Sequence, residues 1–329
     1  MNEPIHIVSG ADARFSPGLL VVATSALVNL PNSTPVFFHV LDGGLPSSVR
    51  KELKFICKTL QPKGEVVFHN IQNTFLKQFS AGLGGSAMFY ARLQMASLIP
   101  EAEKVIYLDA DMVVLGNLLD LWSRDLDLKT AWACQDHKLK HLEEDCPWTL
   151  DANERAHPYF NSGMMIVDLR AWRRDNLEEI LISEARNAGK KLQWWDQTVL
   201  NYVLRGKVGI LPQAWNWQQS NFPTGDDTIN VIHFTSPKKP WLYWGLSRRH
   251  EIWRNYFKKS GGRYWHLIKQ YMGLKGFAEG IVDGLLLRFK IFRKAYIANL
   301  EIRRHFTKNT DRKKDLIQSI AFYKSTIDG

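Results

Sequence analysis

The segment KVIYLDADMVVL, residues 104–115, decides the fold of this chain. Its apolar residues predict a buried strand, which Asp109 and Asp111 interrupt. An unpaired buried charge is too costly to be incidental, and alternate side chains of an extended chain face the same side. We therefore expect the two carboxylates to share a cation. Oxygen ligands favour Mg²⁺ or Mn²⁺, which suit a diphosphate held at a strand end of an open α/β sheet.

A D-x-D motif taken alone also fits three further roles in proteins. Such a pair occurs at a solvated strand end or as a helix cap. A hydrophobic strand followed by D-x-D is also how haloacid-dehalogenase-type phosphatases present a nucleophilic aspartate, here Asp109. Those enzymes usually carry it near the start of the catalytic domain, whereas about a hundred residues precede it in this chain.

The sequence before the motif alternates between strands and helices. Strands are predicted at 5–10, 36–44 and 65–71, and helices at 17–30 and 47–60. This alternation predicts an α/β fold with a mostly parallel, doubly wound sheet.

Further elements are predicted after residue 80. Gly82, Gly84 and Gly85 indicate a loop, either a lid or a plain connection, before a helix at 86–99. A helix at 117–122, a strand ending at Asp136, a strand and helix over 159–174 and a helix near 195 follow. Two short strands, KVGILP and NVIHF, complete the pattern, and the polar stretch 137–158 has no readable periodicity.

Composition limits the class of protein. The 329 residues carry a net charge of +10, and residues 258–329 hold 16 Lys and Arg against 6 Asp and Glu. Three cysteines without C-x-x-C spacing, Cys57, Cys134 and Cys146, favour free thiols in a reducing compartment. The N-terminal residues show no signal-peptide pattern and no stretch has the length of a membrane span, so we expect a cytoplasmic protein.

Seven motifs in order are similar to those of one known family. They are HIVSGAD at 6–12, FHVLDGG at 38–44, YARL at 90–93, YLDADMVV at 107–114, YFNSGMMIVDL at 159–169, WDQTVLN at 195–201 and HFTSPKKPW at 233–241. Over residues 5 to 245 the chain resembles glycosyltransferase family 8, in particular bacterial lipopolysaccharide and lipooligosaccharide α-galactosyl- and α-glucosyltransferases.

The resemblance implies a GT-A fold, a Rossmann-like domain that binds a UDP-hexose and Mn²⁺, or Mg²⁺, and transfers the sugar with retention. It assigns the metal to Asp109, Asp111 and His233. It assigns the nucleotide and diphosphate contacts to Ala11, Asp12, Arg92, Asp109, Ala110, Asp111 and Lys239. The donor sugar and reacting centre are assigned to Asp136, Asn161, Asp196 and Gln197.

The chemistry of these residue types agrees with the assignment. Negative charge develops on a departing UDP while the anomeric carbon becomes oxocarbenium-like, so a Lewis-acidic metal and a lysine lower the barrier. No carboxylate is an obvious nucleophile, which favours front-face attack assisted by the leaving phosphate. Ala13, Arg14 and Ser236 depart from the family pattern at the nucleotide and diphosphate contacts.

The last seventy residues lie outside the resemblance. Phe277, Ile281, Leu285, Phe289, Phe292, Tyr296 and Leu300 form an apolar helical stripe, flanked or opposed by Arg288, Lys290, Arg293 and Lys294. Such a basic amphipathic helix either lies on an anionic membrane or packs on the catalytic domain. We expect a catalytic domain at 1–257 and a basic helical extension at 258–329 that contacts the inner face of the plasma membrane. No nucleic-acid motif is present, so no nucleic-acid partner is expected.

The sequence thus predicts a metal-dependent retaining hexosyltransferase acting on the oligosaccharide of a surface glycolipid. The alternatives are a phosphatase with Asp109 as nucleophile and a non-catalytic protein that binds sugar nucleotides or glycans. We expect the acceptor to lie over 137–158 and near the aromatic residues Trp194, Trp195, Trp215 and Trp217.

Overall fold

The computed structural model describes residues 3–81, 86–219 and 228–288, and the single residues 296, 297, 300, 301, 304 and 317. The chain forms two compact units, Met1–Lys239 with Asn255–Gly262, and Pro240–Arg254 with Arg263–Gly329. The predicted glycine loop lies outside the described residues, as do Phe289 and Phe292 of the apolar stripe and the cations Lys290, Arg293 and Lys294.

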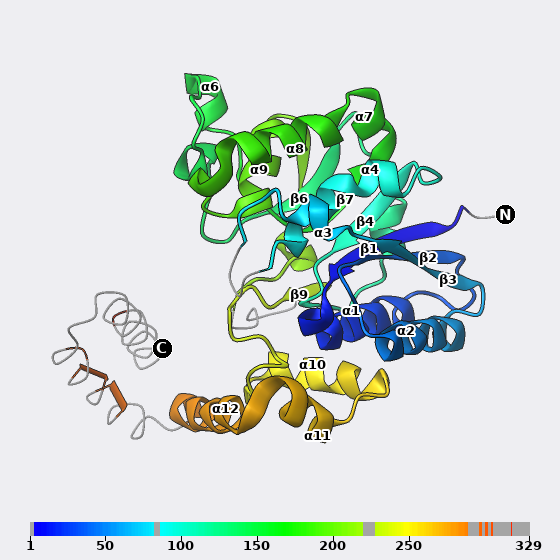
Figure 1. Cartoon of the computed structure of the whole chain (residues 1–329), viewed down its shortest axis with the longest axis vertical. Coiled ribbons are helices and arrows are strands. Elements are labelled where there is room, and N and C mark those ends of the chain that lie inside the picture. The colour runs from blue at the N-terminus through cyan, green and yellow to red at the C-terminus, as the bar shows by residue number, and fades with distance from the viewer. Residues whose placement is uncertain are drawn as a thin grey trace. The chain divides into compact units, whose positions relative to one another are not determined.

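A single sheet organises the first unit (Figure 1). Within the described residues it has seven strands in the order β3-β2-β1-β4-β7-β6-β8. They are β1 (Ile5–Ala11), β2 (Val36–Asp42), β3 (Gly64–Asn70), β4 (Lys104–Leu108), β6 (Ala131–Gln135), β7 (Phe160–Asp168) and β8 (Val208–Leu211). β7 is antiparallel to both neighbours and the other pairs are parallel, which confirms the predicted mostly parallel sheet.

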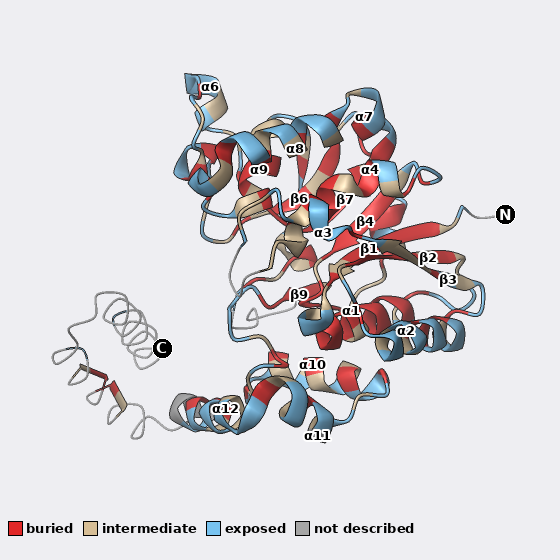
Figure 2. Ribbon diagram, viewed as in Figure 1, coloured by how far each residue is buried: buried red, intermediate tan, exposed pale blue. Residues whose placement is uncertain are grey.

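Helices cover both faces of the sheet (Figure 1). On one face lie α1 (Ser16–Val28) and α2 (Ser47–Leu60), and on the other α4 (Met95–Leu98), α7 (Leu169–Arg174), α8 (Leu177–Ala188) and α9 (Trp195–Val203). Alternate strand residues feed the two cores: Ile106 packs on the α1 side and Val105 on the α9 side. Figure 2 shows the resulting buried strands between exposed outer helix faces.

A second, small sheet positions the site. β5 (Met112–Val114) pairs antiparallel with β9 (Val231–His233). The remaining short helices are α3 (Asn73–Leu76), α5 (Leu119–Trp122) and α6 (Ala152–Arg155). The predicted helix at 86–99 is instead a 3₁₀ helix at Met88–Gln94 followed by α4, so the backbone tightens where Arg92 is buried.

Three histidines form a row across neighbouring strands of the main sheet. His6 of β1, His39 of β2 and His69 of β3 follow one another, with Nδ1 to Nε2 distances of 2.9 Å and 3.0 Å. His39 is fully buried, and burial lowers its pKa to about 3, helped by the two neighbouring rings. Burial also lowers the pKa of His6 and His69, so the row is neutral at pH 7.

The second unit has an aromatic core. It contains the first part of α10 (Arg248–Lys259), then α11 (Tyr264–Leu267), a π-helical turn at Ile268–Met272, and α12 (Gly273–Arg288). Trp244 packs on Tyr264 and Phe277, and its backbone lies so close to Gly280 that a Cβ there would clash with the Trp244 carbonyl oxygen. Among the residues the structure describes, no helix is both long and apolar enough to span a membrane.

Candidate functional site

The two aspartates of the D-x-D motif lie in a turn at the carboxyl end of β4. The strand ends at Leu108, residues 109–111 turn, and β5 begins at Met112. The expectation that both carboxylates share one face of an extended strand is therefore wrong. They converge because the turn bends the backbone, while Ala110 is buried in the core between them.

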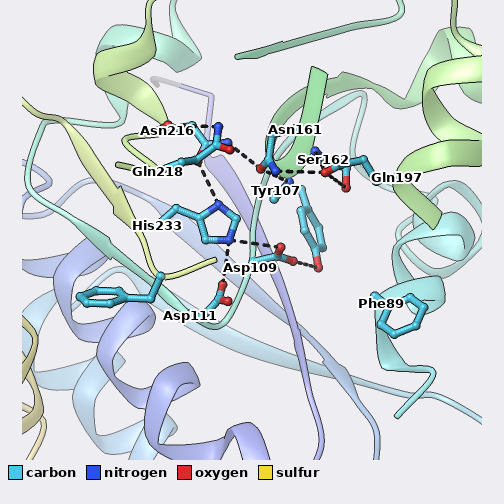
Figure 3. Close-up of polar contacts among 12 residues, drawn as sticks. Phe89, Tyr107, Asp109, Asp111, Asn161, Ser162, Gln197, Asn216, Gln218 and His233 are labelled. Carbon is cyan, nitrogen blue, oxygen red and sulfur yellow. Dashed lines mark hydrogen bonds and ion pairs between the residues drawn. The ribbon is translucent and has the colours of Figure 1, made fainter. Parts of the chain in front are cut away.

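His233 joins the two aspartates through the small sheet. Met112 of β5 pairs with His233 of β9, and the Phe234 amide donates to the Asp111 carbonyl at 3.0 Å. His233 Nε2 lies 3.1 Å from Asp111 Oδ1 and 3.8 Å from Asp109 Oδ2 (Figure 3). One ligand atom from each of the three residues falls within 4.8 Å of the others.

This donor set fits a divalent cation. Two carboxylates and an imidazole are ligands that Mn²⁺ and Mg²⁺ accept. Asp111 Oδ1 is buried and receives no hydrogen bond from a described residue, although His233 Nε2 lies near it. The other oxygen, Oδ2, accepts from Lys239 Nζ at 2.5 Å. Burial would raise the pKa of Asp111, but Lys239 and His233 outweigh it and hold the pKa well below its usual range.

Arg92 bridges two acidic side chains. Its Nη2 lies 2.8 Å from Asp109 Oδ1 and its Nε 2.9 Å from Asp196 Oδ2, while its side chain is 3% exposed. Burial raises the pKa of Asp196 to about 7 despite Arg92, and Asp109 adds to the rise. Burial likewise raises the pKa of Asp109, opposed by Arg92. Arg92 therefore holds the motif and the start of α9 together.

Side-chain amides link His233 of this cluster to the start of β7 (Figure 3). His233 Nδ1 lies 3.0 Å from Asn216 Oδ1, and Asn216 Nδ2 donates to Asn161 Oδ1 at 2.9 Å. Asn161 Nδ2 in turn donates to Asp136 Oδ2 at 3.1 Å and to Gln197 Oε1 at 3.0 Å. The four residues predicted around the reacting centre are thus brought together, because Asp196 precedes Gln197 on α9.

The predicted nucleotide contacts lie at the carboxyl end of β1. Ala11 is the last residue of the strand and Asp12 caps the following turn. The Asp12 carboxylate pairs with Arg14 at 3.0 Å and accepts from Ser86 Oγ at 3.1 Å. Its contacts therefore involve Arg14 and Ser86, and the described contacts do not join it to the metal cluster.

Three residues of the site were missed by sequence reasoning. Asn216 is fully buried beside His233, and Tyr107 donates its hydroxyl to Asp109 Oδ1 at 3.0 Å. A Cβ on Gly163 would clash with His233 Cε1 and would meet Asp109 Oδ2 at 2.8 Å. The glycine within FNSG and the asparagine after Trp215 were visible signals, but only the fold shows what they contact.

The aromatic residues expected at the acceptor divide into two groups. Trp194 is 40% exposed, and the ring of Trp195 lies 5.1 Å from that of Phe89. Trp195 has φ of 49°, an unusual backbone for a bulky residue directly before Asp196. Trp215 is instead buried in the core, so the expectation that it contributes to an acceptor surface is wrong.

Known proteins share this sequence pattern. A general stress protein A of Bacillus subtilis is 25% identical over 290 residues, covering 81% of this chain and 96% of its own. The lipopolysaccharide 1,2-glucosyltransferase of Escherichia coli K12 is 24% identical over 312 residues, covering 85% and 90%.

The fold also matches a solved structure. The crystal structure of the galactosyltransferase LgtC with donor and acceptor sugar analogs aligns with a TM-score of 0.64 and 25% identity, over 78% of this chain and 95% of that one. The α/β sheet is therefore of the GT-A type. The model of the family described as glycosyl transferase family 8 matches residues 6–245, and the chain belongs to glycosyltransferase family 8.

Proposed function

We propose that this glycosyltransferase is a metal-dependent retaining hexosyltransferase. It moves galactose or glucose from a UDP-sugar to the oligosaccharide of a lipopolysaccharide-type glycolipid. The observation that carries the proposal is the cluster of Asp109, Asp111 and His233, in which Lys239 pairs with the Asp111 carboxylate. Membership of the family and the glucosyl- and galactosyltransferases among its matches support the sugar class.

The residues of the cluster suit a diphosphate leaving group. Asp109, Asp111 and His233 would hold a divalent ion, which would supply Lewis acidity to the departing UDP. Lys239 supplies a second positive charge, with its Nζ 2.5 Å from Asp111 Oδ2. When a metal ion shares the negative charge of Asp111, this ammonium group can move to a phosphate oxygen of the donor. The Arg92 guanidinium pairs with both Asp109 and Asp196. Arg92 therefore acts on the donor indirectly, by holding Asp109 in position.

The geometry around β7 supports front-face transfer. Gln197 Oε1 accepts from Asn161 Nδ2 and from the Ser162 amide, and Asp196 is buried against Arg92. A carboxylate held in this way is a poor covalent nucleophile. We assign Asp136, Asn161 and Gln197 to the donor sugar's hydroxyls and no residue to a covalent intermediate.

We assign the nucleotide base of the donor to Ala11 and Asp12, at the carboxyl end of β1. Arg14 stands beside Asp12 with half of its side chain exposed and adds hydrogen-bond donors for carbonyl oxygens. We assign the acceptor to the surface around Trp194, since exposed aromatic rings pack on sugar faces.

The test is UDP release from a panel of UDP-sugars by the purified full chain, with Mn²⁺ and then with EDTA. Slow hydrolysis of one UDP-hexose, lost on chelation, is the expected result and names the donor. Release of phosphate from phosphosugars, with a covalent aspartyl intermediate and no dependence on His233, would support the phosphatase instead. Mn²⁺-dependent UDP binding without consumption of any donor in the presence of acceptor would indicate a binding protein.

We further propose that the basic extension contacts anionic membrane at the cytoplasmic face. Exposed apolar side chains on α12, Leu274, Val282 and Leu285, support this surface, as do the cations from Arg288 onward. The second unit mixes 240–254 with residues after 263, so removing the tail would disrupt its core. Charge replacement in the full chain is the sharper test.

Glutamate is introduced at Arg288, Lys290, Arg293 and Lys294, and binding to vesicles containing phosphatidylglycerol is measured by sedimentation. The control replaces four exposed cations of the first unit, Lys51, Lys63, Lys77 and Arg186. We expect the glutamate variant of the extension to lose binding to the vesicles and the control variant to keep it. Equal binding by the two variants would contradict a specific role of the extension.

A further inference from the structure

We propose that Asn216 is a positioning residue that fixes the tautomer of His233 and so makes its Nε2 a metal ligand. The inference rests on the proposed metal site. It concerns a residue that no motif pointed to, in the segment between β8 and β9. The backbone path, the amide orientations and the imidazole itself support it in turn.

The backbone brings Asn216 to His233. The chain leaves β8, makes a 3₁₀ turn at Gln213–Trp215 and then runs beside β9. The Trp217 amide donates to the Val231 carbonyl at 2.8 Å, and the His233 amide donates to the Trp217 carbonyl at 3.0 Å. Asn216 is fully buried at this junction, and its side chain lies between His233 and β7 (Figure 3).

Backbone donors decide which way each amide points. The Gly163 amide donates to one terminal atom of Asn161 at 3.1 Å, so that atom is the oxygen, Oδ1. The other terminal atom, Nδ2, faces the Asp136 carboxylate, which only accepts. Gln197 is fixed in the same way, because its Oε1 accepts from the Ser162 amide at 3.1 Å.

The orientation of the Asn161 amide then determines that of the Asn216 amide. Since Asn161 Oδ1 is an acceptor, the Asn216 atom 2.9 Å from it must be the donor, Nδ2. Asn216 Oδ1 therefore faces His233 Nδ1 at 3.0 Å. A carbonyl oxygen only accepts, so His233 Nδ1 carries the hydrogen.

The imidazole is left with its other nitrogen toward the carboxylates. A ring protonated at Nδ1 would offer its Nε2 lone pair to a bound cation, whose charge would offset the repulsion between this lone pair and Asp111 Oδ1, 3.1 Å away. The opposite tautomer would place two lone pairs, from Nδ1 and Asn216 Oδ1, against each other. Hydrogen bonds of this kind hold ligand rings in place, and their removal typically weakens metal binding about ten- to a hundred-fold.

The experiment compares Asn216→Leu with Asn216→Asp in the full chain. The two replacements have nearly the shape of asparagine, and both lose the donor to Asn161 Oδ1, but only aspartate keeps an oxygen that can accept from His233 Nδ1. Mn²⁺ affinity is measured by electron paramagnetic resonance in the presence of UDP. We expect Asn216→Leu to bind Mn²⁺ about ten- to a hundred-fold more weakly and Asn216→Asp to stay within a few-fold of wild type.

A second readout reports the tautomer itself. ¹⁵N NMR of histidine-labelled protein with Mg²⁺ and UDP, assigned with a His233→Gln sample, distinguishes hydrogen on Nδ1 from hydrogen on Nε2. We expect Nδ1–H in the wild type and in Asn216→Asp. Gln61→Leu is the matched control, since Gln61 is also a buried amide but donates to the carbonyls of Leu27 and Leu30 around the end of α1. It should leave Mn²⁺ affinity unchanged.

Three outcomes overturn the inference in distinguishable ways. Unchanged Mn²⁺ affinity in Asn216→Leu removes the positioning role while leaving the metal site. Equal weakening by leucine and aspartate shows that Mn²⁺ binding does not depend on an oxygen that accepts from His233 Nδ1. A wild-type protein that binds no Mn²⁺, or an Asp111→Asn variant that binds it equally well, removes the proposed metal site and this inference together.

Discussion

Two buried polar networks of the first unit differ in charge and in sequence span. The histidine row joins three adjacent strands through neutral rings, with no charged residue in its described hydrogen bonds. The site network joins elements between Arg92 and Lys239 and contains Asp109, Asp111 and Asp196 as well as two cations. A neutral network can lose a member at moderate cost, whereas removal of one partner from a buried ion pair leaves an uncompensated charge. Changes in the site network should therefore alter function, and changes in the histidine row should alter only stability.

The largest effect is expected from Asp111→Asn. The change keeps the shape of the side chain but removes the charge that faces both His233 and Lys239. We expect donor turnover to fall by about 10³-fold, because a ligand and its charge are lost at the leaving group. UDP release measures this, with Asp120→Asn on an exposed position as the control. Turnover near wild type would remove Asp111 from the metal site.

Arg92→Met tests the cost of an unpaired charge. It leaves Asp109 and Asp196 without the guanidinium that both contact. The free energy of unfolding should fall by about 3 kcal/mol, against less than about 1 kcal/mol for Arg14→Met, because the Arg14 side chain is 53% exposed and water screens its pair with Asp12. Urea unfolding measures both values. Equal losses would show that burial does not distinguish these two ion pairs.

Gly163→Ala tests the close packing of Gly163 against His233 and Asp109. The added Cβ would clash with His233 Cε1 and meet Asp109 Oδ2 at 2.8 Å, so one or both of these side chains must shift away from residue 163. We expect Mn²⁺ affinity to fall by about ten-fold, as when a ligand's support is lost. Gly10→Ala is the control, because its Cβ would meet Leu41 at an ordinary 3.5 Å. If both variants bind Mn²⁺ equally, the ligands tolerate the displacement.

The smallest effect on activity is expected in the histidine row. The folded-state pKa of His39 is lowered to about 3, so in mild acid the unfolded chain binds more protons than the folded one. The contribution of His39 to stability is therefore complete above about pH 6.5 and falls as the pH drops toward 3. His39 alone should account for a loss of about 3 kcal/mol between about pH 7 and pH 4.

His39→Gln isolates that contribution from the carboxylates. The variant should retain turnover at about pH 7 and lose about 3 kcal/mol less stability than wild type on going to about pH 4. Urea unfolding across this range measures the difference, with exposed His266→Gln as the control. An unchanged pH dependence in His39→Gln would show that His39 takes up its proton in the folded state.

Local patterns predicted the sheet but only part of the site. Strands such as β1, β2 and β4 were readable because burial on both faces leaves continuous apolar runs. The D-x-D motif stood out for the same reason, as two charges inside such a run. Its geometry was predicted wrongly, since a three-residue turn between two strands looks like one strand in the sequence.

Local sequence patterns could not predict contacts between residues far apart in the chain. His233 entered through resemblance, and Asn216 did not enter at all, because its role depends on lying beside residues 17 and 55 positions away. The tightness at Gly163 is likewise set by His233, which arrives from another sheet. Sequence period gives the face of a strand, but it does not say which distant element will cover that face.

The pairing of β5 with β9 has a consequence for the order of folding. Asp109 and Asp111 are followed by more than a hundred residues before His233 and Lys239 arrive, and contacts of such high sequence separation form late. A chain emerging during synthesis therefore presents the two carboxylates before it possesses His233 and Lys239. Binding of the proposed metal ion would therefore follow the docking of the last strand, and it would report completed folding.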